Sequence, residues 1–144
     1  MTIAITGITG NMGQAALAQL SNAPNIDKIK LLCHSKKRMK KLLKRHKSLR
    51  PKIELVEGGM SDRTAIQSLI SGAAIVINMA AVIPPRSDQN PKAAVACNQT
   101  GVQVLVHEIE RMQPAQPALV HVSTVAVYGN RSGAHPFARV GDPL

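Results

Sequence analysis

The most informative segment of this chain is TGITGNMG, residues 6–13. It follows the apolar run TIAIT (2–6) directly and leads into the Ala- and Leu-rich run NMGQAALAQLSN (11–22). A Gly-x-x-Gly-x-x-Gly turn between a strand and a helix allows a sharp bend, admits a pyrophosphate to the backbone and packs helix against strand. The amides at the helix N-terminus then face the phosphates. The alternative is an ordinary strand–helix turn whose glycines serve steric needs alone.

Outward from this turn, short β-branched runs alternate with helical patterns. The alternation is typical of a parallel sheet with right-handed crossovers and helices on both faces. We therefore expect an α/β fold, a Rossmann-type doubly wound sheet of strand order 3-2-1-4-5, with a loop from Gly129 onward. The expected strands are 2–6, 28–33, 52–57, 73–81 and 118–124, and the expected helices are 11–22, 36–49, 62–72 and 91–112.

Length and composition narrow the function further. The 144 residues suffice for one domain, and an aromatic fraction of 1% implies an aliphatic core without stacking platforms for single-stranded nucleic acid. Cys33 and Cys97 lack metal-ligand spacing, so we expect no metal site. No secretory leader and no apolar run of about 20 residues is recognised, so we expect a cytoplasmic protein without a membrane partner.

The positive charge is concentrated in one segment. Residues 28–52 hold 12 of the 18 Lys and Arg residues and no acidic residue. At the end of the second strand of such a fold, a carboxylate binds the ribose 2′-hydroxyl of NAD, whereas cations accommodate the 2′-phosphate of NADP. The absence of a carboxylate favours NADP, with NAD as the alternative. The residues expected around the adenosine ribose are His34, Ser35, Lys36, Lys37 and Arg38.

Two other interpretations of the basic segment stay open. Met39, Leu42, Leu43, His46 and Leu49 form one stripe at helical spacing, which makes the lysines a solvated outer face. The second is a polyanion-binding surface over 36–52, which would bind nucleic acid in a salt-sensitive way. Nucleic acid is the weaker alternative because no recognisable binding fold accompanies the charge.

Five ordered motifs resemble the extended short-chain dehydrogenase/reductase superfamily, the NAD-dependent epimerase/dehydratase group. After the glycine turn come VEGGMSD (56–62), INMAAVIPP (77–85), NQTGVQVLV (98–106) and HVSTVAVYG (121–129). The resemblance covers nearly the whole chain. One departure is Gly59, which stands where the family usually has an Asp that contacts the adenine, so Met60 or a backbone group would serve instead.

The resemblance implies which residues meet the cofactor and the substrate. Thr124 matches the catalytic Ser/Thr, whose hydroxyl polarises the substrate oxygen. The expected cofactor-binding residues are Gly7, Thr9, Gly10, Asn11, Met12 and Gly13 at the pyrophosphate, Gly59 and Met60 near the adenine, Ala80, Ala81 and Val82 on the nicotinamide side, and Asn98 and Val122 from the later motifs.

The family's Tyr-x-x-x-Lys pair is missing. The only tyrosine, Tyr128, is followed four residues later by Ser132. We therefore interpret residues 1–144 as a single NAD(P)-binding domain, the N-terminal part of a longer enzyme and inactive alone. The complete enzyme would transfer hydride at a hydroxyl- or carbonyl-bearing carbon of a nucleotide sugar, a steroid-like alcohol or another carbonyl compound. The alternative is a non-catalytic dinucleotide-binding regulatory module. An apolar fifth strand at the sheet edge also favours a homo-oligomer.

Overall fold

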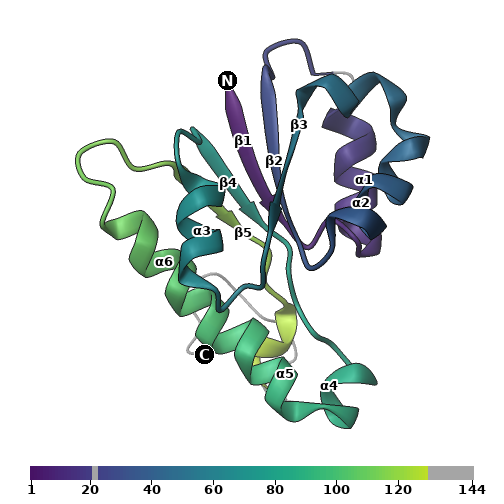
Figure 1. Cartoon of the computed structure of the whole chain (residues 1–144). Helices are drawn as coiled ribbons and strands as arrows, with labels where there is room; N and C mark the ends of the chain where they lie inside the picture. The colour runs from purple at the N-terminus through teal and green to yellow at the C-terminus, as the bar shows by residue number, and fades with distance from the viewer. Residues whose placement is uncertain (21–22, 130–144) are drawn as a thin grey trace.

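A five-stranded parallel sheet organises the chain (Figure 1). The computed structural model describes residues 1–20 and 23–129. The strand order is β3-β2-β1-β4-β5, which confirms the predicted Rossmann-type topology with strands three and five at the edges. The strands are β1 (Thr2–Thr6), β2 (Lys28–Cys33), β3 (Ile53–Glu57), β4 (Ile75–Asn78) and β5 (Ala118–His121).

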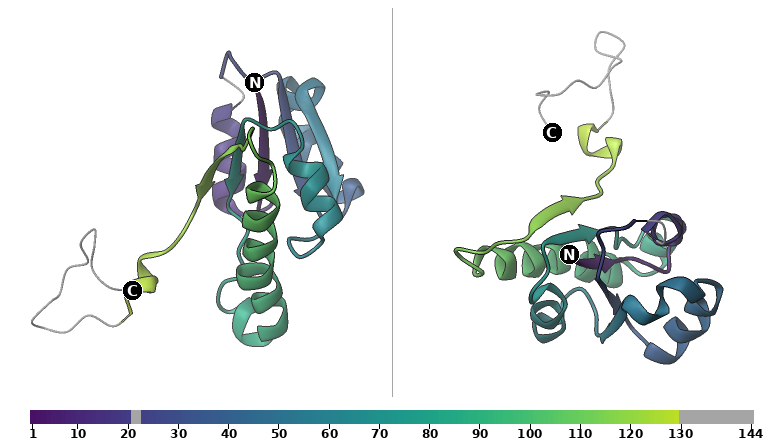
Figure 2. Two further views of the ribbon diagram at one scale, coloured as in Figure 1. Left: turned by 90° about the vertical axis from the view of Figure 1, so that its left-hand side faces the viewer. Right: turned by 90° about the horizontal axis from the view of Figure 1, so that it is seen from above.

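Helices cover both faces of the sheet, because alternate residues of its central strands are apolar on each side. On one face, α1 (Asn11–Leu20) and α2 (Lys36–Leu42) bury Leu17 and Met39 against β1 and β2. On the other face lie α3 (Arg63–Ile70) and α6 (Gly101–Glu110), which bring Leu69 and Leu105 into the second core. Figures 1 and 2 show the two layers.

The helix predicted over 36–49 is interrupted in the structure. After α2 the chain forms two 3₁₀ turns, η1 (Leu43–Arg45) and η2 (Lys47–Lys52), separated by His46 in a non-helical conformation. Like charges on successive turns disfavour a continuous α-helix, and Pro51 cannot donate the next backbone hydrogen bond. The apolar stripe still reaches the core, since Met39, Leu43 and Leu49 are buried.

The helix predicted over 91–112 also differs. It consists of α5 (Pro91–Val95), a π-helical turn η3 (Ala96–Thr100) and α6, and a short helix α4 (Arg86–Gln89) precedes it. The side chain of Asn90 caps α5 by accepting from the amide of Ala93 at 3.0 Å, so α4 and α5 are separate helices.

Three further elements are shorter than expected. The strand predicted over 73–81 is ordered as β4 only to Asn78, and the one over 118–124 ends at His121, after which the chain leads away from the sheet to η4 (Val125–Tyr128) (Figure 2). The helix predicted over 62–72 is α3, and Asp62 caps it, with Oδ1 accepting from Ala65 N at 3.1 Å. Its other end is capped from the sheet, where Nζ of the buried Lys30 donates to the carbonyls of Ser68 and Ser71.

β5 forms one edge of the sheet. The side chains of Leu119 and Val120 are exposed there, in agreement with the expected apolar edge. Within the part of the chain that the structure describes, no helix combines the length and apolar character needed to cross a bilayer. The expected loop beyond Gly129 lies outside the described residues.

Candidate functional site

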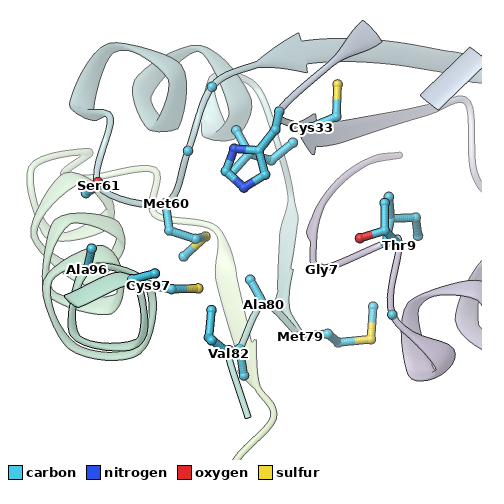
Figure 3. Close-up of a pocket in the computed structure, with 18 of the residues that line it drawn as sticks. Gly7, Thr9, Cys33, Met60, Ser61, Met79, Ala80, Val82, Ala96 and Cys97 are labelled. Atoms are coloured by element: carbon cyan, nitrogen blue, oxygen red, sulfur yellow. The ribbon is translucent and has the colours of Figure 1, made fainter. Parts of the chain in front are cut away.

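A cleft of about 530 Å³ opens at the carboxyl ends of β1, β2 and β4, where Rossmann-type sheets bind their ligands. Figure 3 shows Gly7 and Thr9 on one side, Met60, Ser61, Ala96 and Cys97 on the other, and Ala80 and Val82 between them. Its walls come from five separate segments: Gly7–Gly10, residues 32–34, 58–61, 79–82 and the helices after residue 86.

The glycine turn has the geometry that its sequence predicts. Gly7 takes a positive φ of 73°, and a Cβ on it would lie 2.4 Å from the carbonyl carbon of Met79. A Cβ on Gly13 would lie 2.4 Å from the carbonyl oxygen of Gly7, so only glycine lets α1 approach β1 this closely. Gly10 instead has only ordinary contact at 3.4 Å and is exposed, as a close approach by a ligand requires.

A buried polar network joins the strand ends below the cleft. The hydroxyl of Thr6 at the end of β1 donates to Oδ1 of Asn78 at the end of β4, and both side chains are fully buried. Nδ2 of Asn78 lies 3.0 Å from Nδ1 of His121 on β5. Because an amide NH₂ can only donate, this pairing makes Nδ1 of His121 the acceptor. The network holds three neighbouring strand ends in register.

The segment after β4 is held on its other side by Asn98. Its Oδ1 accepts from the backbone amide of Val82, and its Nδ2 donates to the Val82 carbonyl, each at 2.8 Å. Asn98 therefore does not line the cleft itself but is hydrogen-bonded to Val82, which does.

At the end of the cleft where the adenosine is expected, the structure brings together the His34 imidazole, Gly59, and the charged residues Lys36 and Glu57. A Cβ placed on Gly59 would lie 3.5 Å from Cε1 of His34, so the imidazole packs over this glycine. At the start of α2, the exposed Lys36 donates its backbone amide to Oε1 of Glu57 at 3.3 Å. A carboxylate from β3 thus stands where β2 supplies none.

Two thiols line the cleft in their neutral state. Burial raises the pKa of the Cys97 thiol, and burial together with the Glu57 carboxylate raises that of Cys33. Neither has the lowered pKa of a nucleophilic cysteine. Across residues 1–20 and 23–129, no three His, Cys, Asp or Glu side chains gather to hold a metal ion.

About half of the predicted cofactor residues line the cleft: Gly7, Thr9, Gly10, His34, Gly59, Met60, Ala80, Ala81 and Val82. Asn11 and Met12 lie just outside it at the exposed start of α1, and Gly13 contacts the turn from below. Lys36 borders a separate shallow groove along β3, and Ser35 and Lys37 are adjacent to it in sequence. The side chain of Arg38 lies outside what the structure describes. Val122 and Thr124 follow β5 and do not line the cleft.

Sequence reasoning missed several lining residues, above all Arg86. It is the only Lys, Arg, Asp or Glu among the lining residues of the described chain. Arg86 is the first residue of α4 and directly follows the prolines at 84 and 85. Because proline often precedes or begins a helix, these prolines were the feature of the sequence from which the position of Arg86 could have been predicted. Of the other missed residues, Ile8 belongs to the glycine turn and Leu32 to β2, whereas Ala93 and Cys97 reach the cleft through the packing of α5 and η3.

Sequence comparison gives the family. The profile of the NAD dependent epimerase/dehydratase family matches residues 3–141. The chain belongs to this family. The resemblance inferred from the five motifs is thereby confirmed.

Solved structures of similar fold support the architecture. The family member resembles Pen from Bacillus thuringiensis with a TM-score of 0.74 at 20% identity, over 89% of this chain and 38% of that one. It resembles the dTDP-glucose 4,6-dehydratase of Bacillus anthracis in complex with NAD with a TM-score of 0.69 at 22% identity, over 96% and 42%. For the Bordetella bronchiseptica enzyme WbmH in complex with NAD⁺ the values are 0.65 and 23%, over 89% and 40%.

This epimerase/dehydratase-family chain spans 38% to 42% of the length of those three proteins. No curated protein is significantly similar to it in sequence.

Proposed function

We propose that this chain binds NADP in the cleft described above, with the pyrophosphate on the glycine turn. The observation that carries the proposal is the exposed Gly10, which stands between two glycines fixed by backbone contacts and in front of the free amides of α1. Two properties of the cleft suit a dinucleotide. The volume of the cleft lies in the range of cofactor sites, and Arg86 is the one Lys, Arg, Asp or Glu among its described lining residues. That guanidinium suits a phosphate.

The choice of NADP rests on charge at the start of α2. Lys36 and Lys37 are exposed there, and the end of β2 carries no carboxylate. Glu57 acts in the opposite direction, since its carboxylate accepts from the first amide of α2. With Lys36, Lys37 and Arg38 adjacent, positive charge predominates, which favours a 2′-phosphate. NAD, which is bound in two of the three similar structures named above, is the competing ligand.

The chemistry we propose for the family member is hydride transfer at a carbon bearing a hydroxyl or carbonyl group, which the nicotinamide supplies when bound. Thr124 would polarise the substrate oxygen. A nucleotide sugar is the favoured substrate class, in line with the name of the Bacillus anthracis neighbour. Proton transfer to the substrate needs the Tyr-x-x-x-Lys pair, which residues 1–144 do not contain. The activity is therefore proposed for a protein in which such a pair accompanies this domain.

Calorimetric titration of the chain with NADPH and, in parallel, NADH tests the proposal. We expect NADPH to bind more tightly, and the Lys36→Ala/Lys37→Ala variant to lose that advantage. The matched control is Lys40→Ala/Lys41→Ala, which removes the same charge one turn further along α2. Equal binding of both dinucleotides would refute the NADP preference. Binding of neither, with salt-sensitive affinity for DNA, would favour the polyanion alternative.

A further inference from the structure

Residues 79–82 run beside the cleft with no helix or strand of their own, yet their backbone is held at two points. The amide of Ala80 lies 3.3 Å from Oγ1 of Thr6 and 3.4 Å from Oδ1 of Asn78. Two residues later, Asn98 pairs with both backbone polar groups of Val82 at 2.8 Å. The segment is thus fixed from the sheet on one side and from a helix on the other.

The helix that supplies Asn98 changes its geometry at that residue. Asn98 lies in the π-helical turn η3, between α5 and α6. Such turns are rare and occur frequently at functional sites. In the same turn Cys97 lines the cleft, while Leu105 and Ile109 of α6 enter the core beneath the sheet. Because the π-helical turn contains one extra residue, α6 can pack on the sheet while Asn98 in η3 faces Val82.

Stability does not account for this arrangement. Asn98 is exposed, and hydrogen bonds that water can replace add little to the free energy of folding. An amide that pairs with both the N–H and the C=O of one residue instead restricts the rotation of that residue's backbone. Its effect falls on the shape of residues 79–82, which border the cleft.

We propose that Asn98 is a positioning residue that acts through Val82 to fix one wall of the cleft, in place of the direct cofactor contact that its motif suggests. The inference rests on the proposed dinucleotide binding, with residues 80–82 on the nicotinamide side. Loss of the two hydrogen bonds between Asn98 and Val82 then weakens binding of a whole dinucleotide and leaves binding of its adenosine half unchanged.

The test compares Asn98→Ala and Asn98→Asp with the control Gln99→Ala, an exposed neighbour on the same turn. The readouts are the hydrogen-exchange rate of the Val82 amide without ligand, the affinities for NADPH and adenosine 2′,5′-bisphosphate, and the melting temperature. For Asn98→Ala we expect exchange at Val82 to accelerate about tenfold and NADPH affinity to fall about tenfold, with bisphosphate affinity and melting temperature unchanged. Asn98→Asp keeps the acceptor for the Val82 amide and gives intermediate values, and Gln99→Ala behaves as wild type.

Three results would overturn the inference. These are an unchanged exchange rate at Val82, undiminished NADPH affinity in Asn98→Ala, or an equal loss of both ligands together with a lower melting temperature. If the wild-type chain binds neither ligand, the dinucleotide proposal itself fails. The exchange rate of the Val82 amide still shows whether Asn98 restrains the backbone of Val82, because no ligand is present in that measurement.

Discussion

Oε1 of Glu57, at the end of β3, accepts a hydrogen bond from the backbone amide of Lys36, the first residue of α2, at 3.3 Å. The two residues are 21 positions apart and meet because β2 and β3 pair in register, with Cys33 opposite Glu57. This hydrogen bond places a carboxylate against the start of α2. The carboxylate therefore opposes the positive charge on which the proposed NADP preference depends.

Replacing Glu57 by Gln is expected to strengthen NADPH binding about fivefold, because one unit of repulsion near a 2′-phosphate at the protein surface is on the order of 1 kcal/mol. NADH affinity should stay the same, since NADH carries no 2′-phosphate. Parallel titrations of the two dinucleotides measure the ratio. Glu54→Gln is the control, because Glu54 on the same strand pairs with Lys28. A parallel gain for NADH would show that Glu57 does not discriminate.

Arg86→Gln is expected to weaken dinucleotide binding about tenfold, since a guanidinium–phosphate contact is a charge-assisted hydrogen bond. Stability should not change, because Arg86 is exposed at the start of the short helix α4. Lys92→Gln, an exposed cation on α5 outside the cleft, serves as the control. Unaltered affinity in Arg86→Gln would remove this residue from the site.

The glycines of the turn should divide into two kinds. Gly13→Ala places a methyl group 2.4 Å from the Gly7 carbonyl oxygen and 2.5 Å from Cα of Ile8, and neither backbone atom can move aside. We expect a loss of about 2–3 kcal/mol in the free energy of unfolding, as for other overpacked sites. Gly10→Ala meets only one contact, at 3.4 Å, so it should fold normally and lose dinucleotide binding. Urea unfolding and calorimetry on both variants separate the effects, and a stable, binding-competent Gly13→Ala would contradict the assignment.

The strand-end network should contribute to stability. Thr6→Val removes the hydroxyl that donates to Asn78 and accepts from Ala80, and leaves buried polar groups without that partner. We expect a cost of about 1–3 kcal/mol in the free energy of unfolding. A double-mutant cycle with Asn78→Leu should be non-additive, because both changes affect one network. Additive losses would show that the two side chains act independently.

Glu108 predicts a pH dependence of stability. It is buried between α3 and α6, where Nε2 of Gln67 donates to Oε2 at 2.8 Å and Nε of Arg63 lies 3.1 Å from Oε1. The hydrogen bond from Gln67 and the Arg63 charge lower the pKa of this carboxyl below its usual 4.5. Because the folded state holds the proton less tightly than the unfolded state, the stabilisation is complete above about pH 4.5 and is lost as the pH falls through the lowered value. Melting curves from pH 7 to 3 should show a shallower acid decline for Glu108→Gln, and an identical decline would exclude this group as a cause.

Local patterns in the sequence were sufficient to predict the sheet and the glycine turn. The alternation of apolar runs with helical patterns is a local property, and it predicts a parallel sheet with helices on both faces, whose expected order β3-β2-β1-β4-β5 the structure confirms. The spacing of Gly7, Gly10 and Gly13 likewise carries its meaning within eight residues, so the turn could be predicted with its steric roles. The cap of α3 by Asp62 is equally local.

The meeting of distant groups around the cleft depends on the tertiary structure. Glu57 reaches α2 because of the strand register, Asn98 reaches Val82 because η3 is a π-helical turn, and His121 reaches Asn78 because β5 lies beside β4. The register depends on the pairing of whole strands, and the π turn depends on how α6 packs on the sheet. None of these three contacts is encoded in a short segment, because the partners in each are 16 to 43 residues apart in the chain.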